Sequence, residues 1–371
     1  FRIDYTLGVY PLQQYVTELS RGRLQVLTVA WDARAATEGG QRWYSLYPDE
    51  PVAPSDPLHW TRRSHNWNSM CAECHATGVT KNFDLTGDSW HTSVSDDTIT
   101  CEACHGAGQG HVDWARSDRK RDPTGNHGFA FALTEKGGGY WGGFDSRGIR
   151  RWNGPPRSNV VLEQCAGCHA RRHWLADGLQ SHGNFADTHS LSLLENGLYF
   201  PDGQIRDEVF ELGSFLQSRM HAAGVTCTDC HEPHQAKLKA EGNALCSQCH
   251  DPARFDTTAH HHHQPDTVAA RCTTCHMPER TYMGVHVRHD HSLRLPAPAR
   301  AAALGSPDPC TRCHQDRKPE ALDATIRGWF GPPNRPPRAQ ADVIVATAFA
   351  SLARQPDPAA LPVISTALGN R

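Results

Sequence analysis

Seven copies of one five-residue pattern, Cys-x-x-Cys-His, are the residues of this sequence best suited to chemistry. Numbered motif 1 to motif 7 in chain order, they use all 14 cysteines: Cys71 and Cys74, Cys101 and Cys104, Cys165 and Cys168, Cys227 and Cys230, Cys246 and Cys249, Cys272 and Cys275, and Cys310 and Cys313. The histidines that close them are His75, His105, His169, His231, His250, His276 and His314. Two thiols at this spacing can form thioethers to both vinyl groups of one haem, and the adjacent histidine is then the proximal ligand of the iron. The sequence therefore predicts seven covalently attached haems of the c type.

Three other uses of paired cysteines fit the pattern less well. A four-cysteine zinc site consumes the pairs two at a time, whereas seven is an odd number, and zinc gives no reason for a histidine after every second cysteine. A thioredoxin-like redox motif is expected once, near a βαβ unit. A disulfide framework leaves the motif histidines unexplained.

The remaining histidines are candidates for the second axial position of the irons. Seven of the 24 histidines lie in the motifs, and neutral imidazole suits haem iron. The candidates, chosen by their place near motifs or turns, are His59, His111, His189, His221, His234, His261, His263 and His291. In the run His260–His263 one or two imidazoles are expected to bind iron, with His261 and His263 favoured. Asp290 could orient the imidazole of a neighbouring histidine.

Other histidines are interpreted as surface or propionate-pairing residues, namely His65, His91, His127, His173, His182 and His286. The arginines and lysines near the motifs are likewise expected to pair with haem propionates. Methionine ligation is disfavoured because histidine is abundant. No catalytic residue is assigned.

The composition indicates a thin side-chain core. The 371 residues include 38% hydrophobic residues, 31 glycines and 25 prolines. Haem is a large apolar plate, so chain wrapped around several haems buries porphyrin in place of aliphatic side chains. Without haem, the chain is expected not to fold. The formal charge of −3 does not point to nucleic acid or an anionic membrane.

The expected fold class is mainly α with extensive irregular chain around the haems, preceded by a small β element and followed by a helical hairpin. A small antiparallel sheet is predicted before residue 57, with a hairpin turn at Ser20–Gly22. A short helix is predicted over residues 59–70, and helix-like apolar spacing occurs over residues 208–220. Residues 106–160 are predicted to be an irregular excursion. The expected domains are 1–57, a β-rich element; 58–330, a heptahaem domain; and 331–371, a Pro-rich linker with the start of a helical repeat.

No run of about 18 apolar residues predicts a transmembrane helix. The chain begins within an apparent strand and shows no signal peptide, so a processed or partial chain is expected. Covalent haem attachment takes place outside the cytoplasmic membrane, which predicts a periplasmic or extracellular protein.

The motifs with their flanking residues resemble bacterial multihaem cytochromes fused to tetratricopeptide-type repeats, which are related to the superfamily of hydroxylamine oxidoreductase and pentahaem nitrite reductase. The resemblance covers most of residues 1–330 and lies in the segments 67–75, 101–111, 165–172, 213–234 and 272–291. It implies electron transfer through haems stacked in pairs. Such relatives usually carry a further motif upstream, so a histidine of this chain could ligate a haem that this sequence does not encode.

Two functions of different classes follow. The first is an electron carrier with mostly bis-histidine haems, redox partner proteins and, as a variant, assembly into a homo-oligomer or filament. The second is an oxidoreductase of nitrogen or sulfur compounds with one five-coordinate haem, whose pocket could include Arg171, Arg172, Tyr282 and His286. The catalytic Cys-x-x-Cys-Lys variant of many pentahaem nitrite reductases is absent from the sequence, which favours the carrier.

Overall fold

A computed structural model describes residues 2–117, 122, 125–130, 132–135, 137–176, 183–332 and 362–363. The chain forms two compact units. Unit 1 consists of Phe1–Leu133, Trp174–Ser190 and Thr281–Arg288, and unit 2 consists of Thr134–His173, Leu191–Arg280 and His289–Arg371. Motifs 1 and 2 therefore belong to unit 1, and motifs 3 to 7 belong to unit 2.

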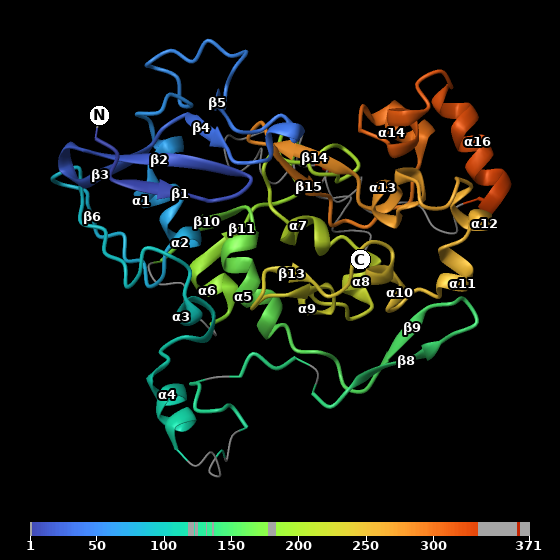
Figure 1. The fold of residues 1–371 in the computed structure, drawn as a ribbon, viewed down its shortest axis with the longest axis horizontal. Helices are drawn as coiled ribbons and strands as arrows, with labels where there is room; N and C mark the ends of the chain where they lie inside the picture. The colour runs from blue at the N-terminus through green and yellow to red at the C-terminus, as the bar shows by residue number, and fades with distance from the viewer. Residues whose placement is uncertain are drawn as a thin grey trace. The chain divides into compact units, whose positions relative to one another are not determined.

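Unit 1 begins with a five-stranded antiparallel sheet (Figure 1). Its strands are β1 (Tyr5–Leu7), β2 (Leu12–Leu19), β3 (Arg23–Val26), β4 (Val29–Asp32) and β5 (Arg42–Ser45). The order is β1-β2-β4-β5, and β3 pairs with β2. The small antiparallel sheet predicted from the sequence is thus present.

The predicted turn between β2 and β3 depends on backbone conformations that favour glycine. Ser20–Gly22 forms a short 3₁₀ segment, η1, in which Arg21 and Gly22 both have positive φ, of 66° and 69°. A Cβ on Gly22 would lie 2.1 Å from the carbonyl oxygen of Trp90. Glycine at this position therefore permits both the turn and the close approach of the chain at Trp90.

The other elements of unit 1 are short. They are η2 (Ala36–Glu38), η3 (Arg63–His65), α1 (Trp67–Met70), α2 (Ala72–His75), β6 (Phe83–Asp84), β7 (Ser89–Trp90), α3 (Cys101–His105), α4 (Gln109–Arg116) and α6 (Phe185–Thr188). Strand β6 pairs with β7. Where the chain passes between the two units, β10 (Arg172–Trp174) pairs with β11 (His189–Leu191), and β14 (Glu279–Tyr282) pairs with β15 (His286–His289).

Unit 2 consists of short helices and two hairpins. The hairpins pair β8 (Tyr140–Phe144) with β9 (Arg150–Asn153) and β12 (His231–Glu232) with β13 (Lys237–Leu238). The helices are α5 (Val160–His169), α7 (Leu212–Phe215), α8 (Arg219–Ala222), α9 (Cys227–Cys230), α10 (Ala244–Ser247), α11 (Pro252–Phe255), α12 (Thr258–His261), η4 (Val268–Ala270), α13 (Cys272–His276), α14 (Pro298–Leu304), α15 (Pro309–Cys313) and α16 (Pro319–Phe330).

Several expectations need correction. The described chain is mixed helix and sheet rather than mainly α, because its helices are short and hairpins separate them. The helix expected over residues 59–70 is confined to α1, and residues 208–220 contain α7 and the start of α8 in place of one helix. The excursion 106–160 contains α4 and the β8–β9 hairpin.

The predicted domains, 1–57, 58–330 and 331–371, stay a prediction. The N-terminal sheet lies in the same compact unit as motifs 1 and 2. The predicted linker and helical tail, residues 331–371, lie outside the described residues except for 331–332 and 362–363.

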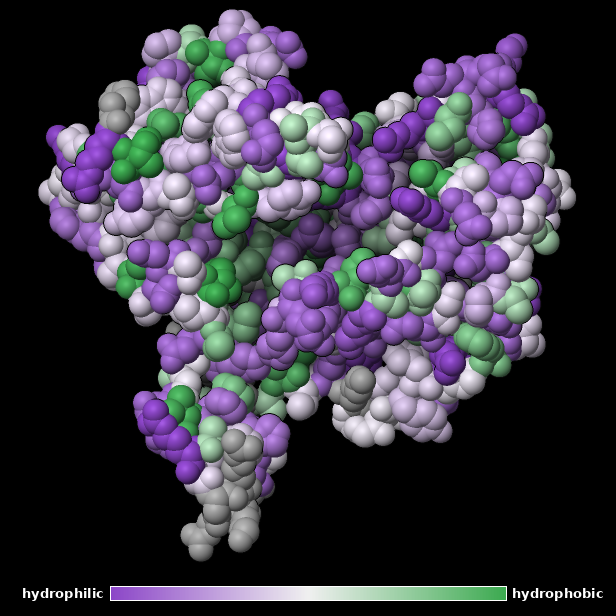
Figure 2. Space-filling view, viewed as in Figure 1, coloured by the Kyte–Doolittle hydropathy of each residue, from purple (hydrophilic) through white to green (hydrophobic). Residues whose placement is uncertain are grey.

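The side-chain core is thin. Many of the buried apolar residues are alanines, among them Ala30, Ala72, Ala166 and Ala301. Large apolar side chains are exposed at scattered positions, and green residues stand among purple ones over the face in Figure 2. Within the described residues, no helix has the length and apolar character needed to cross a membrane.

Candidate haem-binding sites

Every motif lies on or beside a helical turn. The turns are α2, α3, α5, α9, α10, α13 and α15 for motifs 1 to 7 in order. In motifs 1, 5 and 7 the amide of the histidine donates to the carbonyl of the first cysteine, at 3.1, 2.9 and 2.8 Å. Residues three apart on a helix share a face, so each turn directs two thiols to the same side. This arrangement suits attachment to the two vinyl groups of one porphyrin.

Buried amide side chains fix motif 1 against the N-terminal sheet. Asn66 caps α1 by accepting from the amide of Ser69 at 3.0 Å, and its own amide donates to Gln25 Oε1 at 3.0 Å. The oxygen of Asn68 accepts from the amide of Leu24 at 2.8 Å. Because the two asparagines lie only five and three residues before Cys71, these bonds to the sheet fix the chain just ahead of the first haem turn.

A buried arginine fixes motif 4. Arg157, whose side chain is 2% exposed, forms ion pairs with Glu135 and with Asp229, which lies inside the motif. It also donates to Thr226 Oγ1 at 2.8 Å, and Asp229 in turn accepts from the amide of Thr226 at 2.9 Å. Two carboxylates and one guanidinium therefore hold the turn of α9 from within unit 2.

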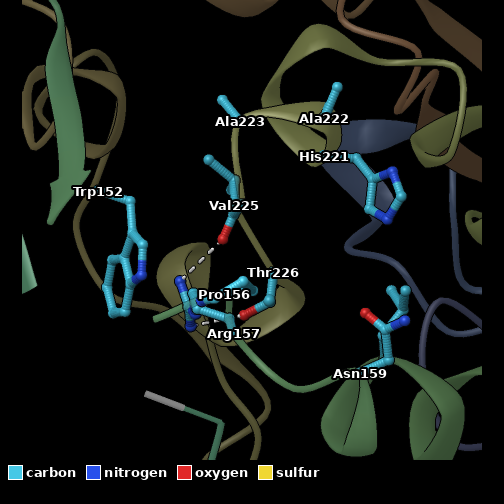
Figure 3. A pocket seen from close by; sticks show the side chains of 11 residues that line it. Trp152, Pro156, Arg157, Asn159, His221, Ala222, Ala223, Val225 and Thr226 are labelled. Atoms are coloured by element: carbon cyan, nitrogen blue, oxygen red, sulfur yellow. Dashed lines mark hydrogen bonds between the residues drawn. The ribbon is translucent and has the colours of Figure 1, made fainter. Parts of the chain in front are cut away.

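A cavity of about 300 Å³ adjoins this arginine and the first turn of α5 (Figure 3). His221 lies on its wall, across the cavity from Trp152. Burial lowers the pKa of His221, so its imidazole is neutral at pH 7, the form that binds iron. This places one of the predicted ligands beside the helix that carries motif 3.

Asp308 caps the turn of motif 7. Its carboxylate accepts from the amides of Cys310, at 2.9 Å, and Thr311, at 3.2 Å, and Pro309 occupies the first helical position. Burial raises the pKa of Asp308, against the opposing effect of these amides. The local sequence Asp-Pro before the first cysteine is therefore a helix start that sets the motif in place.

Motifs 3 to 7 form a row in unit 2. The thiol of Cys165 in motif 3 is near that of Cys227 in motif 4, whose pKa it lowers, and α5 packs on α9. The thiol of Cys246 in motif 5 is likewise near that of Cys272 in motif 6. Burial, with smaller effects of Asp229 and the nearby thiol of Cys249, raises the pKa of Cys230 to about 11, so motifs 4 and 5 are also neighbours. Motif 7 adjoins motif 6 because α15 packs on α13. Successive motifs are therefore adjacent in space as well as in sequence.

In three motifs, a histidine from outside the motifs faces the motif histidine. The pairs are His231 with His291, His276 with His260, and His314 with His263, and their ring centroids are 6.3, 6.3 and 6.1 Å apart. A bond of about 2 Å between a metal and an imidazole nitrogen, on both sides of one iron, places two ring centroids about 6.3 Å apart. All three separations fit an iron between the rings.

The residues present fit covalently bound haem in two further respects. None of the 14 cysteines is joined in a disulfide, and the described residues contain no cluster of three or more Cys, His, Asp or Glu that could hold a metal ion by themselves. Arg150 Nε beside motif 5 and Arg300 Nη2 on α14 are buried without a hydrogen-bond partner among the described residues. A haem propionate is an anion that would supply the missing acceptor.

Two protein families and one solved structure are similar to parts or most of this chain. The family described as cytochrome c554 and c-prime matches residues 41–106, and the family of the doubled CXXCH motif matches residues 221–255. The crystal structure of the outer cell wall cytochrome OcwA is similar to this chain with a TM-score of 0.56 and 18% sequence identity, over 95% of this chain and 79% of that chain. The chain is a multihaem c-type cytochrome. No curated protein matches its sequence.

Two predicted ligands of the cytochrome lie in other arrangements. His189 is fully buried, with Nε2 at 3.1 Å from Glu73 Oε1 and Nδ1 at 2.8 Å from Thr188 Oγ1. Both ring nitrogens thus contact protein side chains, and one of these, Glu73, lies inside motif 1. His234 is a surface residue whose Nδ1 lies 3.3 Å from Glu232 Oε1.

Two further candidates in unit 1 are near aromatic rings. His111 donates from Nδ1 to the carbonyl of His127 at 2.7 Å, and its ring stacks on Phe129, which also stacks on His105 of motif 2. The ring of Phe129 therefore contacts both His111 and the histidine of motif 2. His59 has Nδ1 at 2.8 Å from Thr61 Oγ1, beside Trp60.

The residues proposed for a substrate pocket are engaged in local contacts. Arg172 donates to the carbonyl of Gly167 at 2.6 Å, and Arg171 donates to that of Glu208 at 3.3 Å. Near Tyr282, the guanidinium of Arg288 covers the phenol ring and donates to His286 Nδ1 at 3.3 Å. These contacts are local to the segments that follow motif 3 and to residues 282–288.

Asp290 has a different role from the one expected. Its carboxylate accepts from the backbone amides of Ile205, at 3.1 Å, and Ser292, at 2.8 Å, whereas Nδ1 of His291 donates to the carbonyl of His289 at 3.0 Å. Asp290 therefore positions His291 by fixing the backbone rather than by bonding the imidazole. His260, which was not among the favoured residues, is the imidazole that faces His276.

We expect Asp290→Ala to lower the free energy of unfolding of the haem-loaded protein by about 2–4 kcal/mol, because two backbone donors lose their acceptor in a buried site. Denaturant unfolding followed by circular dichroism measures the change. Asp316→Ala, at an exposed aspartate, is the control and should have little effect. Equal stability of the two variants would contradict this role of Asp290.

Proposed function

We propose that this cytochrome carries electrons through seven covalently attached haems, most of them with two histidine ligands. The row of motifs 3 to 7 in unit 2 is the observation that carries the proposal. Because thiols of different motifs lie near one another, the porphyrins attached to them have their edges close together. Electron transfer between haems is fast only over such short distances. The haems supply the redox chemistry, and the protein supplies spacing, axial ligands and electrostatic surroundings.

The opposed imidazoles support the same function. An iron held by two histidines has no open position for a substrate, so it exchanges electrons without binding a reactant. Burial lowers the pKa of His231, with a further effect from His291, and burial likewise lowers the pKa of His260. Both groups are therefore neutral at pH 7, as ligation to iron requires.

The protein is placed in the periplasm or outside the cell under this proposal, because c-type haem is attached beyond the cytoplasmic membrane. The similar structure is that of an outer cell wall cytochrome, which supports such a location. The partners are redox proteins. In a variant of the proposal, copies join into a homo-oligomer or filament through the exposed N-terminal strands, whose exposed apolar side chains include Tyr5 in β1.

Haem stoichiometry and spin state test the proposal. We expect the mass of the mature chain to include seven haems and the electron paramagnetic resonance spectrum of the oxidised protein to be low-spin throughout. We also expect no spectral change on addition of nitrite, hydroxylamine or cyanide, since each iron carries two protein ligands. Fewer haems would contradict the count. A high-spin iron that binds these molecules would favour the oxidoreductase instead.

A further inference from the structure

The run His260–His263 gives each of its four imidazoles different surroundings. Thr258–His261 forms α12, and His262 ends it in the left-handed conformation, with φ of 56°. Because the backbone turns at His262, the residues before it and the residues after it point in different directions. His260 faces His276 of motif 6, and His263 faces His314 of motif 7.

We propose that His260 is the second axial ligand of the haem iron at motif 6 and that His263 is the second axial ligand of the haem iron at motif 7. The inference rests on the proposed function in one respect, since it requires haem at both motifs. The separations of 6.3 and 6.1 Å between ring centroids leave room for one iron between each pair. A four-residue segment thus bridges two neighbouring haems.

The hydrogen bonds of Nδ1 support this assignment for motif 7 and for the motif 6 histidine. Nδ1 of His263 donates to the carbonyl of His261 at 2.5 Å, and Nδ1 of His276 donates to the carbonyl of Arg294 at 2.7 Å. A neutral imidazole that carries its proton on Nδ1 has its lone pair on Nε2, where it can bind iron. The carbonyls therefore select the tautomer that ligation needs.

His261 and His262 lack this arrangement. Nδ1 of His261 accepts from the amide of His263 at 3.2 Å, so its neutral ring carries the proton on Nε2 and has no lone pair there for a metal. His262 stacks on the indole of Trp329 with ring centroids 3.7 Å apart. These two imidazoles make other contacts, and our proposal assigns ligation to His260 where the sequence favoured His261.

Single substitutions in the mature, haem-loaded protein test the proposal. We expect His260→Ala and His263→Ala each to convert one low-spin iron to a high-spin iron, measured by electron paramagnetic resonance with haem content checked by mass. Added imidazole should restore the low-spin state, because it refills the vacated position. His261→Ala is the matched control and should leave the spin state unchanged.

A methionine variant covers the case in which an alanine variant does not accumulate. His260→Met should remain low-spin and raise the reduction potential of one haem, because a thioether replaces an imidazole. The proposal is overturned if His260→Ala keeps every iron low-spin, if His260→Met shifts no potential, or if His261→Ala produces the high-spin iron. Failure of the proposed function would instead be seen in the unsubstituted protein, as missing haem at motif 6 or motif 7.

Discussion

Produced without haem attachment, the chain is expected to show no cooperative unfolding transition and to be degraded rapidly by protease. The loss equals the whole free energy of unfolding, which is about 5–15 kcal/mol for ordinary domains. The physical reason is the thin core, in which alanines such as Ala72 and Ala166 are buried beside cysteines that would carry porphyrin. Small side chains such as these bury little apolar surface, so without the porphyrins the chain lacks the burial needed to offset its conformational entropy.

Circular dichroism during heating and limited proteolysis measure this loss. The control is the same chain produced together with a haem-attachment system, its haem content verified by mass. A finer comparison replaces Cys272 and Cys275 by alanine, which removes one haem while the rest of the row remains. A haem-free chain that unfolds cooperatively and resists protease would contradict the expectation.

The second large effect is expected at Arg157. Arg157→Met should lower the free energy of unfolding of the haem-loaded protein by about 3–5 kcal/mol, because Glu135 and Asp229 then remain buried as uncompensated carboxylates. Arg157→Lys should recover only part of the loss, since an ammonium cannot make the divided contacts of a guanidinium. Because Asp229 lies within motif 4, we also expect the haem at this motif to become more reactive toward added ligands.

Arg151→Met is the matched control for Arg157→Met. Arg151 forms an ion pair with Asp145 at 3.1 Å, but its side chain is half exposed, so the expected change is below about 1 kcal/mol. Denaturant unfolding of the three variants under one set of conditions gives the comparison. A similar effect at both arginines would show that the buried network around motif 4 is not a special source of stability.

Local sequence determined the parts of this protein that depend on short separations along the chain. The motif pattern indicated covalent haem without any structure, because two thiols and an imidazole within five residues are the whole attachment unit. The turn at Ser20–Gly22 was also readable, since its glycine supplies the positive φ. Long helices were overpredicted because apolar spacing over residues 208–220 does not reveal that the chain bends between α7 and α8.

Only the tertiary structure decided which groups meet across large separations. His231 faces His291 through the packing of unit 2, and Asp290, next to that histidine, is fixed by the amide of Ile205. From the sequence, the run His260–His263 indicated only that imidazoles were available. The left-handed turn at His262 decided that His260 faces motif 6 and His263 faces motif 7. Sequence therefore gives the number and kind of the candidate ligands, but a haem iron joins residues that are distant in the chain, and their pairing depends on how the whole unit folds.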